Sequence, residues 1–302
     1  MNRDRSHQLL YLSHADVQAI GPSMAEIISA LESMFREKGE GRVEMPPKIG
    51  VHTLPDAFIH AMPAYIAAQK AVGMKWVSGY PENSKRGLPY IAGLLILNDA
   101  ETGMPLAVMD CTWITAQRTG AATAVAAKYL ARKESETVGI LGCGVQGRSN
   151  LEALKVLFPL KKARAYDVHS ERAEKYAQEM SSQLGIDAVS VATSREAVVD
   201  CDMVVTAGPI LRKPHATIQR DGSRKEHLRR WWISIPTGIP MRFAKPINSV
   251  LTMCPSSSTI ARSDISRTCR LFTPTWVNSS PDANPAGKRP QNVPSHAILA
   301  LH

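Results

Sequence analysis

The sequence predicts an α/β protein in which an α+β domain precedes a second α/β domain, with an irregular C-terminal tail after them. Three observations lead to this class. Helical patterns alternate with short apolar segments, a glycine-rich turn directly follows one of those segments, and the composition changes near residue 220. At 302 residues with 44% hydrophobic side chains, the chain is long enough to bury two domain cores.

Residues 1–125 are expected to form the α+β domain. Ser23 and Glu26 have capping-box spacing, and apolar residues then recur at helical intervals as far as Gly39, which predicts an amphipathic helix. An alanine-rich stretch at 115–132 predicts a long helix whose small side chains allow close packing and which leads into the next domain. Short apolar segments bounded by Pro, Gly or Asn predict strands at 57–61, 72–78 and 91–97.

The second domain, expected at 126–219, opens with T-V-G-I-L-G-C-G-V-Q-G, in which an apolar strand runs into a G-x-G-x-x-G turn. Gly142 permits the tight turn, and Gly144 lets the backbone approach a pyrophosphate. Gly147 lets the following helix, expected to begin near Arg148, pack on the strand. The helix N-terminus offers N–H groups and a partial positive charge to phosphates. The pattern indicates a Rossmann-type dinucleotide-binding domain, and the alternative is a glycine-rich turn in another α/β domain.

Further strand patterns continue the β-α-β plan. The second strand ends in Asp167, 20 positions after the last loop glycine, where a ribose-binding carboxylate is expected. Thr206 and Ala207 lie at the carboxyl end of the last strand, where such sheets bind ligands. Asp167 favours NAD because a carboxylate repels a 2′-phosphate, whereas Ser170 and Arg172 could accommodate NADP. The expected strands are 138–141, 163–167, 188–191 and 203–206.

Residues 220–302 are expected to form an aberrant, poorly ordered tail. This segment holds 12 of the 36 Lys and Arg residues but only 4 of the 27 Asp and Glu residues, together with 9 of the 20 prolines. Prolines at this density interrupt helices and sheet ladders. The tail therefore carries +8 of the net charge of +9, which does not predict an acidic partner for the protein as a whole.

Membrane, metal and disulfide chemistry are not expected. The first residues are charged and no apolar run reaches bilayer-spanning length, which favours a cytoplasmic protein. The five cysteines contain no C-x-x-C pair and the histidines show no metal-ligand spacing, which favours buried free thiols and no metal site. A basic, Trp-containing tail could bind nucleic acid, but it contains no recognised module, so no nucleic-acid partner is expected.

Several blocks resemble, in one order, the ornithine cyclodeaminase and mu-crystallin family over roughly residues 20–219. They are A-M-P-A-Y, G-M-K-W-V, P-E-N-S-K-R-G-L-P, T-G-M-P-L-A-V-M-D, T-A-Q-R-T-G-A-A and the glycine loop. The resemblance implies a nicotinamide-dependent enzyme, such as a cyclodeaminase making proline from ornithine, an alanine dehydrogenase or an imine reductase. It also implies a homodimer whose first domain supplies both the substrate site and the interface.

The resemblance assigns roles to individual residues. Lys48 and Arg118 would bind the substrate carboxylate, for which a forked guanidinium is well suited. Lys75 would transfer a proton or polarise an imine, with a pKa lowered by desolvation, whereas without the resemblance it would be a surface lysine on a half-exposed strand. His60 falls where some cyclodeaminases have a carboxylate that helps to hold the amino acid. The residues expected to contact the dinucleotide are Thr119, Gly142, Gly144, Val145, Gln146, Gly147, Asp167, Thr206 and Ala207.

The stretch R-R-W-W-I-S-I-P-T-G at 229–238 departs from the family. In the family this region continues the cofactor domain and supplies a substrate-site aspartate. Tryptophan has a single codon, TGG, so the bases under Trp231, Trp232 and Ile233 read Val-Asp when shifted by one nucleotide. Allowed third bases then permit V-D-F-D-S-Y-W-D-P, which resembles the family's acidic segment. We infer a frameshifted reading from about residue 220, and the alternative is a natural basic tail.

The expected function is that of an ornithine cyclodeaminase-like, nicotinamide-dependent oxidoreductase or deaminase, impaired by its altered C-terminus. Hydride would pass between NAD, or NADP, and the Cα of an amino acid or its imine. The alternatives are alanine dehydrogenase or ketimine reductase activity, and a dinucleotide-binding protein without catalysis. The family forms homodimers, and the altered tail leaves open whether this chain does.

Overall fold

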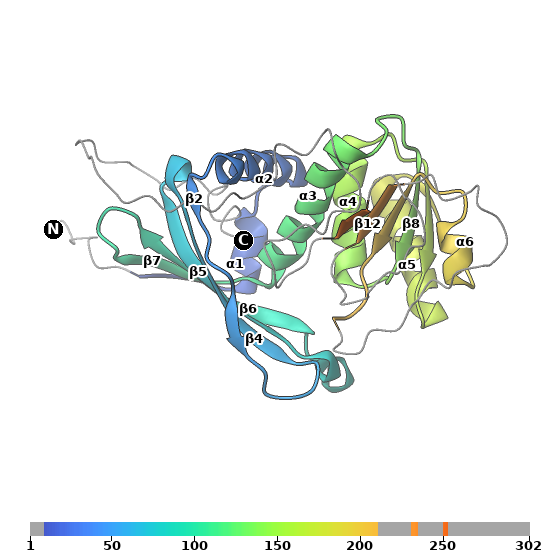
Figure 1. The fold of residues 1–302 in the computed structure, drawn as a ribbon. Helices are drawn as coiled ribbons and strands as arrows, with labels where there is room; N and C mark the ends of the chain where they lie inside the picture. Colours follow the sequence, from blue (N-terminus) through green and yellow to red (C-terminus); the bar gives the residue numbers. More distant parts are fainter. Residues whose placement is uncertain (1–8, 211–230, 235–249, 253–302) are drawn as a thin grey trace.

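The computed structural model describes residues 9–210, 231–234 and 250–252. Two β-sheets lie at opposite ends of this part of the chain, and helices α3 (Thr112–Leu130) and α4 (Val145–Leu157) lie between them (Figure 1). The expectation of an α/β protein is confirmed.

The first sheet has seven strands in the order β1-β7-β6-β5-β4-β2, with β3 paired to β4. Only β1 and β7 are parallel; the other pairs among the described strands of this sheet are antiparallel. The three strands expected from the sequence are present as β4, β5 and β6, and β4 continues past its expected end through Pro63. The bounds are β1 (Leu10–Leu12), β2 (Val43–Glu44), β3 (Ile49–Val51), β4 (Phe58–Ile66), β5 (Ala71–Gly79), β6 (Ile91–Asp99) and β7 (Pro105–Asp110).

Three helices pack in one core with the inner face of this sheet: α1 (His14–Ile20), α2 (Met24–Gly39) and α3. The expected capping box starts α2, because the Ser23 N–H and hydroxyl donate to Glu26 while Ser23 Oγ accepts from the Glu26 N–H. Leu31 and Met34 then face the core almost without exposure. The short 3₁₀ helix η2 (Ala67–Gln69) connects β4 to β5, and η3 (Pro81–Arg86) connects β5 to β6.

The second sheet is wholly parallel, in the order β10-β9-β8-β11-β12-β13. Numbered from β8, this is the order 3-2-1-4-5-6 of a Rossmann fold, whose strand order reverses between β8 and β11. Ligands bind at this point, beyond the carboxyl ends of the strands. The bounds are β8 (Thr137–Leu141), β9 (Lys162–Tyr166), β10 (Asp187–Ser190), β11 (Met203–Thr206), β12 (Trp231–Ser234) and β13 (Val250–Thr252).

Helices cover both faces of the second sheet. Helices α4 and α5 (Ser170–Leu184) pack in the larger core, and α6 (Ser194–Val198) packs in a smaller one on the other side. The close packing expected of the small residues in α3 is present, since a Cβ on Gly120 would lie 2.2 Å from the carbonyl oxygen of Ser149 in α4. None of the helices in the described ranges is long and apolar enough to cross a membrane.

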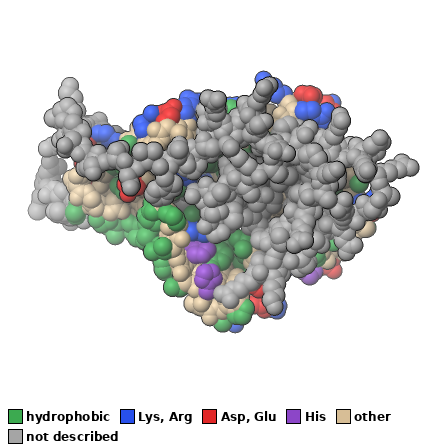
Figure 2. Space-filling model, viewed as in Figure 1, with side chains coloured by type: hydrophobic (Ala, Val, Ile, Leu, Met, Phe, Trp, Pro, Cys, Tyr) green, Lys and Arg blue, Asp and Glu red, His purple; other side chains and the backbone are tan. Residues whose placement is uncertain are grey.

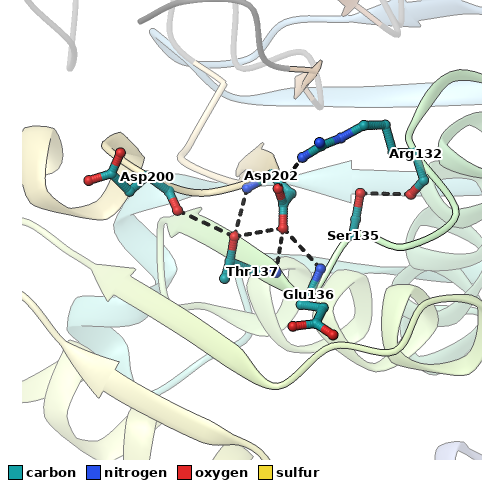
Figure 3. Close-up of polar contacts among 6 residues, drawn as sticks. All are labelled: Arg132, Ser135, Glu136, Thr137, Asp200 and Asp202. Carbon is teal, nitrogen blue, oxygen red and sulfur yellow. Dashed lines mark hydrogen bonds and ion pairs between the residues drawn. The ribbon is translucent and has the colours of Figure 1, made fainter.

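Polar contacts hold β8 and β11 together at their amino ends, away from the ligand-binding edge (Figure 3). Asp202 Oδ2 accepts from the N–H groups of Glu136 and Thr137 at 2.9 and 3.0 Å and from the Thr137 hydroxyl at 2.9 Å. Arg132 forms an ion pair with the other carboxylate oxygen. This network fixes the relative position of the two strands that flank the reversal in strand order.

The tail differs from expectation at two places. Strands β12 and β13 lie in the segment that we expected to be irregular, and they extend the parallel sheet in register from β11. Strand β12 contains the W-W-I-S part of the stretch that we expected to depart from the family. The remainder of the expected disordered tail lies outside the described residues.

Candidate functional site

The glycine loop between β8 and α4 has the geometry that its three glycines predict. Gly142 has φ +103°, and an added Cβ would lie 2.8 Å from the backbone of Ala207, so only glycine fits there. At Gly147 an added Cβ would lie 2.3 Å from the carbonyl oxygen of Gly142, so this glycine allows helix and strand to pack closely. Close contacts within the protein itself therefore explain why Gly142 and Gly147 are glycines.

Gly144 is different, because no atom of the described chain other than its own sequence neighbours lies within 4 Å of where its Cβ would be. Its φ of −83° suits any residue, so the backbone does not require glycine. Gly144 is the N-cap of α4, whose first-turn N–H groups lack intrahelical partners. An open space beside these N–H groups fits a phosphate group, which is what a dinucleotide would present.

The other residues expected to contact a dinucleotide surround this loop. Val145 and Gln146 form the first turn of α4, and the buried Gln146 Oε1 has no hydrogen-bond partner among the described residues. Thr206 ends β11 on the other side of the reversal in strand order, and the N–H of Ala207, which follows it, donates to the carbonyl of Leu141 at 2.7 Å. The loop and the end of β11 are therefore direct neighbours.

Asp167 directly follows β9 and reaches the same loop. Its Oδ2 accepts from the Cys143 N–H at 2.9 Å, and its Oδ1 accepts from the His169 N–H at 3.1 Å. A carboxylate oxygen can accept more than one hydrogen bond, so Asp167 retains capacity for a ribose hydroxyl. The expected strand 163–167 is one residue shorter at this end, which frees Asp167 from the ladder.

A cluster of basic side chains lies on the inner face of the first sheet. Lys75 is central in β5 and only 1% exposed, opposite Met62 of β4 and Leu95 of β6. Arg118, from α3, is mostly buried, and its Nε has no hydrogen-bond partner among the described residues. Lys48, just before β3, is close enough to contribute to the electrostatic environment of Lys75. The alternative of a surface position for Lys75 is therefore wrong.

Burial and mutual repulsion shift the protonation of this cluster. Burial lowers the pKa of Lys75 well below 10.5, and the charges of Arg118 and Lys48 lower it further, while Cys111 partly offsets them. Burial also lowers the pKa of Arg118 to about 10. A desolvated cluster of cationic side chains is stabilised when an anion binds to it.

His60 lies on the same face of the sheet as Lys75, two positions along, because it is opposite Val77 of β5. Its ring stacks on Phe58 at 4.3 Å between centroids and meets His52 edge-on at 6.0 Å. Burial lowers the pKa of His60 to about 4, helped by Lys48, His52 and Lys75, so the ring is neutral at pH 7. Figure 2 shows histidine side chains beside a Lys or Arg side chain in the lower centre of the visible face.

Helix α3 connects the basic cluster with the glycine loop. Arg118 and Thr119 directly precede Gly120, the point at which α3 touches α4, one turn along from the loop. Thr119 itself donates to the carbonyl of Thr115 at 2.7 Å. A second bridge is the Ile210 N–H, which donates to the Tyr90 hydroxyl at 3.4 Å and joins the end of β11 to the first domain.

Sequence reasoning did not single out Cys111, whose thiol is buried and contributes to the electrostatics of both Lys75 and Arg118. A Cβ on Gly93 would lie 3.1 Å from the Cys111 sulfur, a contact that no local pattern reveals. Cys143 and Cys201 are also buried free thiols, as expected, whereas Cys254 and Cys269 lie outside the described residues. Within the described ranges there is no cluster of metal-binding side chains.

Comparison with known proteins agrees with this arrangement. The chain is 42% identical to the alanine dehydrogenase of Archaeoglobus fulgidus over 207 residues, which are 68% of this chain and 62% of that protein. It is 29% identical over 255 residues to an ornithine cyclodeaminase of Agrobacterium fabrum, covering 84% of this chain and 64% of that protein. The chain thus spans somewhat less than two thirds of the length of these relatives.

Solved structures give the same result. The Δ1-pyrroline-2-carboxylate reductase of Thermococcus litoralis, in complex with NADH and L-proline, superposes with a TM-score of 0.68 at 39% identity, covering 75% of this chain and 68% of that one. An archaeal alanine dehydrogenase dimer with bound NAD gives 0.61 at 41% identity, covering 66% and 60%. The sequence profile of the ornithine cyclodeaminase/mu-crystallin family matches residues 10–221, and the chain belongs to that family.

Proposed function

We propose that this protein is a nicotinamide-dependent oxidoreductase that acts on an amino acid or its imine. Two features on either side of α3 support the proposal. One is a buried lysine beside a mostly buried arginine, and the other is the open glycine loop. The first suits a small carboxylate substrate and the second suits a dinucleotide phosphate. The relatives named above are dehydrogenases, reductases and cyclodeaminases.

NAD is the proposed cofactor. The open space beside Gly144 would receive the pyrophosphate, and Asp167 would accept from the ribose hydroxyl. Thr119, Val145, Gln146, Thr206 and Ala207 would line the remaining contact. A carboxylate at the position of Asp167 repels the extra phosphate of NADP, so we expect NAD to be preferred.

The substrate carboxylate would bind between Arg118 and Lys48, where it would neutralise a charge that burial has made costly. Burial lowers the pKa of Lys75 well below its usual 10.5, which makes its ammonium easier to deprotonate and suits a proton transfer at the substrate nitrogen or Cα. The nicotinamide would supply or receive the hydride. The neutral His60 offers no charge to hold a second ammonium, which favours alanine or a cyclic imine over ornithine.

A panel assay tests this proposal. We expect the purified chain to form NADH from NAD with alanine, or to consume NADH with pyruvate plus ammonia or with Δ1-pyrroline-2-carboxylate. Cyclodeamination of ornithine would return the hydride to the product and leave NADH unchanged, so its turnover is measured as proline formed and should be slower. Lys75→Met should abolish that turnover while binding NADH normally. Turnover that persists in a folded Lys75→Met variant would show that Lys75 is not the proton-transferring group.

A second candidate is a dinucleotide-binding protein without catalysis. The family match ends at residue 221, before the region in which the family has its substrate-site aspartate. A chain without that aspartate could bind the dinucleotide without catalysing a reaction. NADH binding without turnover on any substrate of the panel would support this candidate over the first.

We also propose a homodimer formed through the outer face of the first sheet. Strand alternation puts Trp76 on the face opposite Lys75, in one row with Leu94 and Ile49. These side chains are 43%, 38% and 71% exposed, and hydrophobic side chains cover the lower left of the molecule in Figure 2. An apolar face of this extent favours association.

Light scattering tests the dimer. The 33.0 kDa chain should elute at twice its mass, and Trp76→Lys should convert it to the monomer. Val168→Lys is a matched control, because Val168 is an exposed hydrophobic residue of the second domain. Monomeric wild-type protein would exclude this interface.

A further inference from the structure

Two side chains, one from α4 and one from α5, hold the glycine loop by its carbonyl oxygens. Arg148 Nη1 donates to the carbonyl of Cys143 and, at 3.3 Å, to that of Gly144. The Tyr176 hydroxyl, which is fully buried, donates to the carbonyl of Gly147 at 3.0 Å. These bonds lie outside the set of loop contacts that the glycine pattern predicts.

Arg148 is itself held in place from α5. Its Nε and Nη2 both donate to Glu179 Oε2, the first at 3.0 Å, and its guanidinium lies 5.3 Å from the centre of the Tyr176 ring. Lys175 also approaches Glu179, at 3.8 Å. The hydrogen bond from Arg148, followed by the charges of Arg148 and Lys175, lowers the pKa of Glu179 and keeps it ionised.

Holding a carbonyl fixes the next N–H group. In a planar trans peptide the C=O and the following N–H point in opposite directions. When Arg148 draws the oxygens of Cys143 and Gly144 toward α5, the N–H groups of Gly144 and Val145 must point away from it. Carbonyl oxygens facing the same space would repel a phosphate, whereas N–H groups attract one.

We propose that Arg148, Tyr176 and Glu179 form a loop clamp that positions the glycine loop for the pyrophosphate of the dinucleotide. They are positioning residues, because they act through the backbone of the loop. In this arrangement Glu179 neutralises the charge of Arg148, and the guanidinium binds the loop carbonyls and not the ligand. The proposal rests on the cofactor binding proposed above.

Ligand binding to the 302-residue chain tests the clamp without any turnover. NADH and ADP-ribose contain the pyrophosphate, and adenosine does not, so fluorescence titration with NADH and competition by the other two separate phosphate positioning from general damage. The variants are Glu179→Gln, Arg148→Lys and Tyr176→Phe. Asp187→Asn is the control for a lost ion pair, and Tyr129→Phe is the control for a lost tyrosine hydrogen bond.

We expect Arg148→Lys and Glu179→Gln, which disturb charge-assisted hydrogen bonds, to weaken the binding of NADH and ADP-ribose about tenfold. Tyr176→Phe removes a neutral hydrogen bond and should weaken both about fivefold, and adenosine binding should stay within about twofold in every variant. The two controls should match the wild type. Tighter NADH binding in Glu179→Gln would show that Arg148 contacts the phosphate directly and would overturn the clamp. Equal losses for all three ligands, or no loss in folded variants, would also overturn it. Wild-type protein that binds neither NADH nor ADP-ribose would instead refute the proposed cofactor, and the clamp with it.

Discussion

Lys75 combines a buried position with an ionisable group, and that combination costs stability. Its neighbours Arg118 and Lys48 are also cationic, so burial and repulsion both oppose its charged form. Functional sites typically contain side chains that lower the stability of the free protein and interact favourably with a bound ligand.

Replacing Lys75 by methionine should therefore stabilise the protein at pH 7. The folded protein binds fewer protons than the unfolded chain between the lowered pKa and 10.5, so wild-type stability rises with pH across that window. Lys75→Met should remove this rise and increase the melting temperature by about 2 to 4 °C, equivalent to roughly 1 kcal/mol. Thermal melts from pH 6 to 10 measure it, with the exposed Lys162→Met as control.

Arg118→Ala should act mainly on the substrate. Loss of a charged hydrogen-bond donor should weaken a carboxylate substrate by roughly 1.5 to 3 kcal/mol, while the affinity for NADH should stay unchanged. Steady-state KM values for both ligands separate the effects, and Arg164→Ala, on the far side of the second sheet, is the control. An unchanged substrate KM would mean that Arg118 is structural.

At the scale of elements, the sequence predicted those parts of the structure that local patterns determine. The helix capped by Ser23, the strands β5, β6 and β11, and the glycine loop were all expected from spacing alone. Strands β1 and β7 were not, because β1 is three residues long and gains its stability only by pairing with β7, about 97 residues away.

The candidate site was predictable only in part. The glycine loop and Asp167 follow a spacing rule, and Lys75 and Arg118 were named through family resemblance. Arg148 and Tyr176 carry no such signal, because 28 residues separate them along the chain and only the packing of α5 on α4 brings them together. For the same reason the proximity of Cys111 to the basic cluster could not be predicted.

The Asp202 network should be a main source of stability for the second sheet. Its burial would raise the pKa of Asp202, but the hydrogen bonds from Glu136 and Thr137 outweigh that effect and lower it. Asp202→Asn should cost about 1 to 3 kcal/mol at pH 7 in urea unfolding. Because the folded pKa is below 3.8, the stabilisation is complete above that value and is lost as the pH falls below it. The difference in free energy of unfolding between wild type and Asp202→Asn should therefore disappear in acid. Glu101→Gln, which removes a carboxylate from an exposed ion pair, should have the free energy of unfolding of the wild type at every pH.

For the whole molecule, we propose that the segment after residue 220 limits the activity of the chain. The family profile ends at residue 221, close to the inferred change of frame, whereas the alignment with the Agrobacterium fabrum protein spans 255 residues and so reaches beyond it. Strands β12 and β13 complete the six-stranded order. We retain the frameshift as a proposal: the coding DNA should show a single-base insertion or deletion near codon 220, and an intact family reading frame would refute it.

We propose that the loop around Gly144 binds a nicotinamide dinucleotide, and an NADH titration of the purified 302-residue chain is the direct test. We expect saturable enhancement of NADH fluorescence in the wild type. Gly144→Val should fold normally, because its φ of −83° and the open space beside it accommodate a side chain, but should lose NADH binding because that side chain occupies the phosphate position. Absence of binding in the wild type, or unchanged affinity in folded Gly144→Val, would contradict the claim.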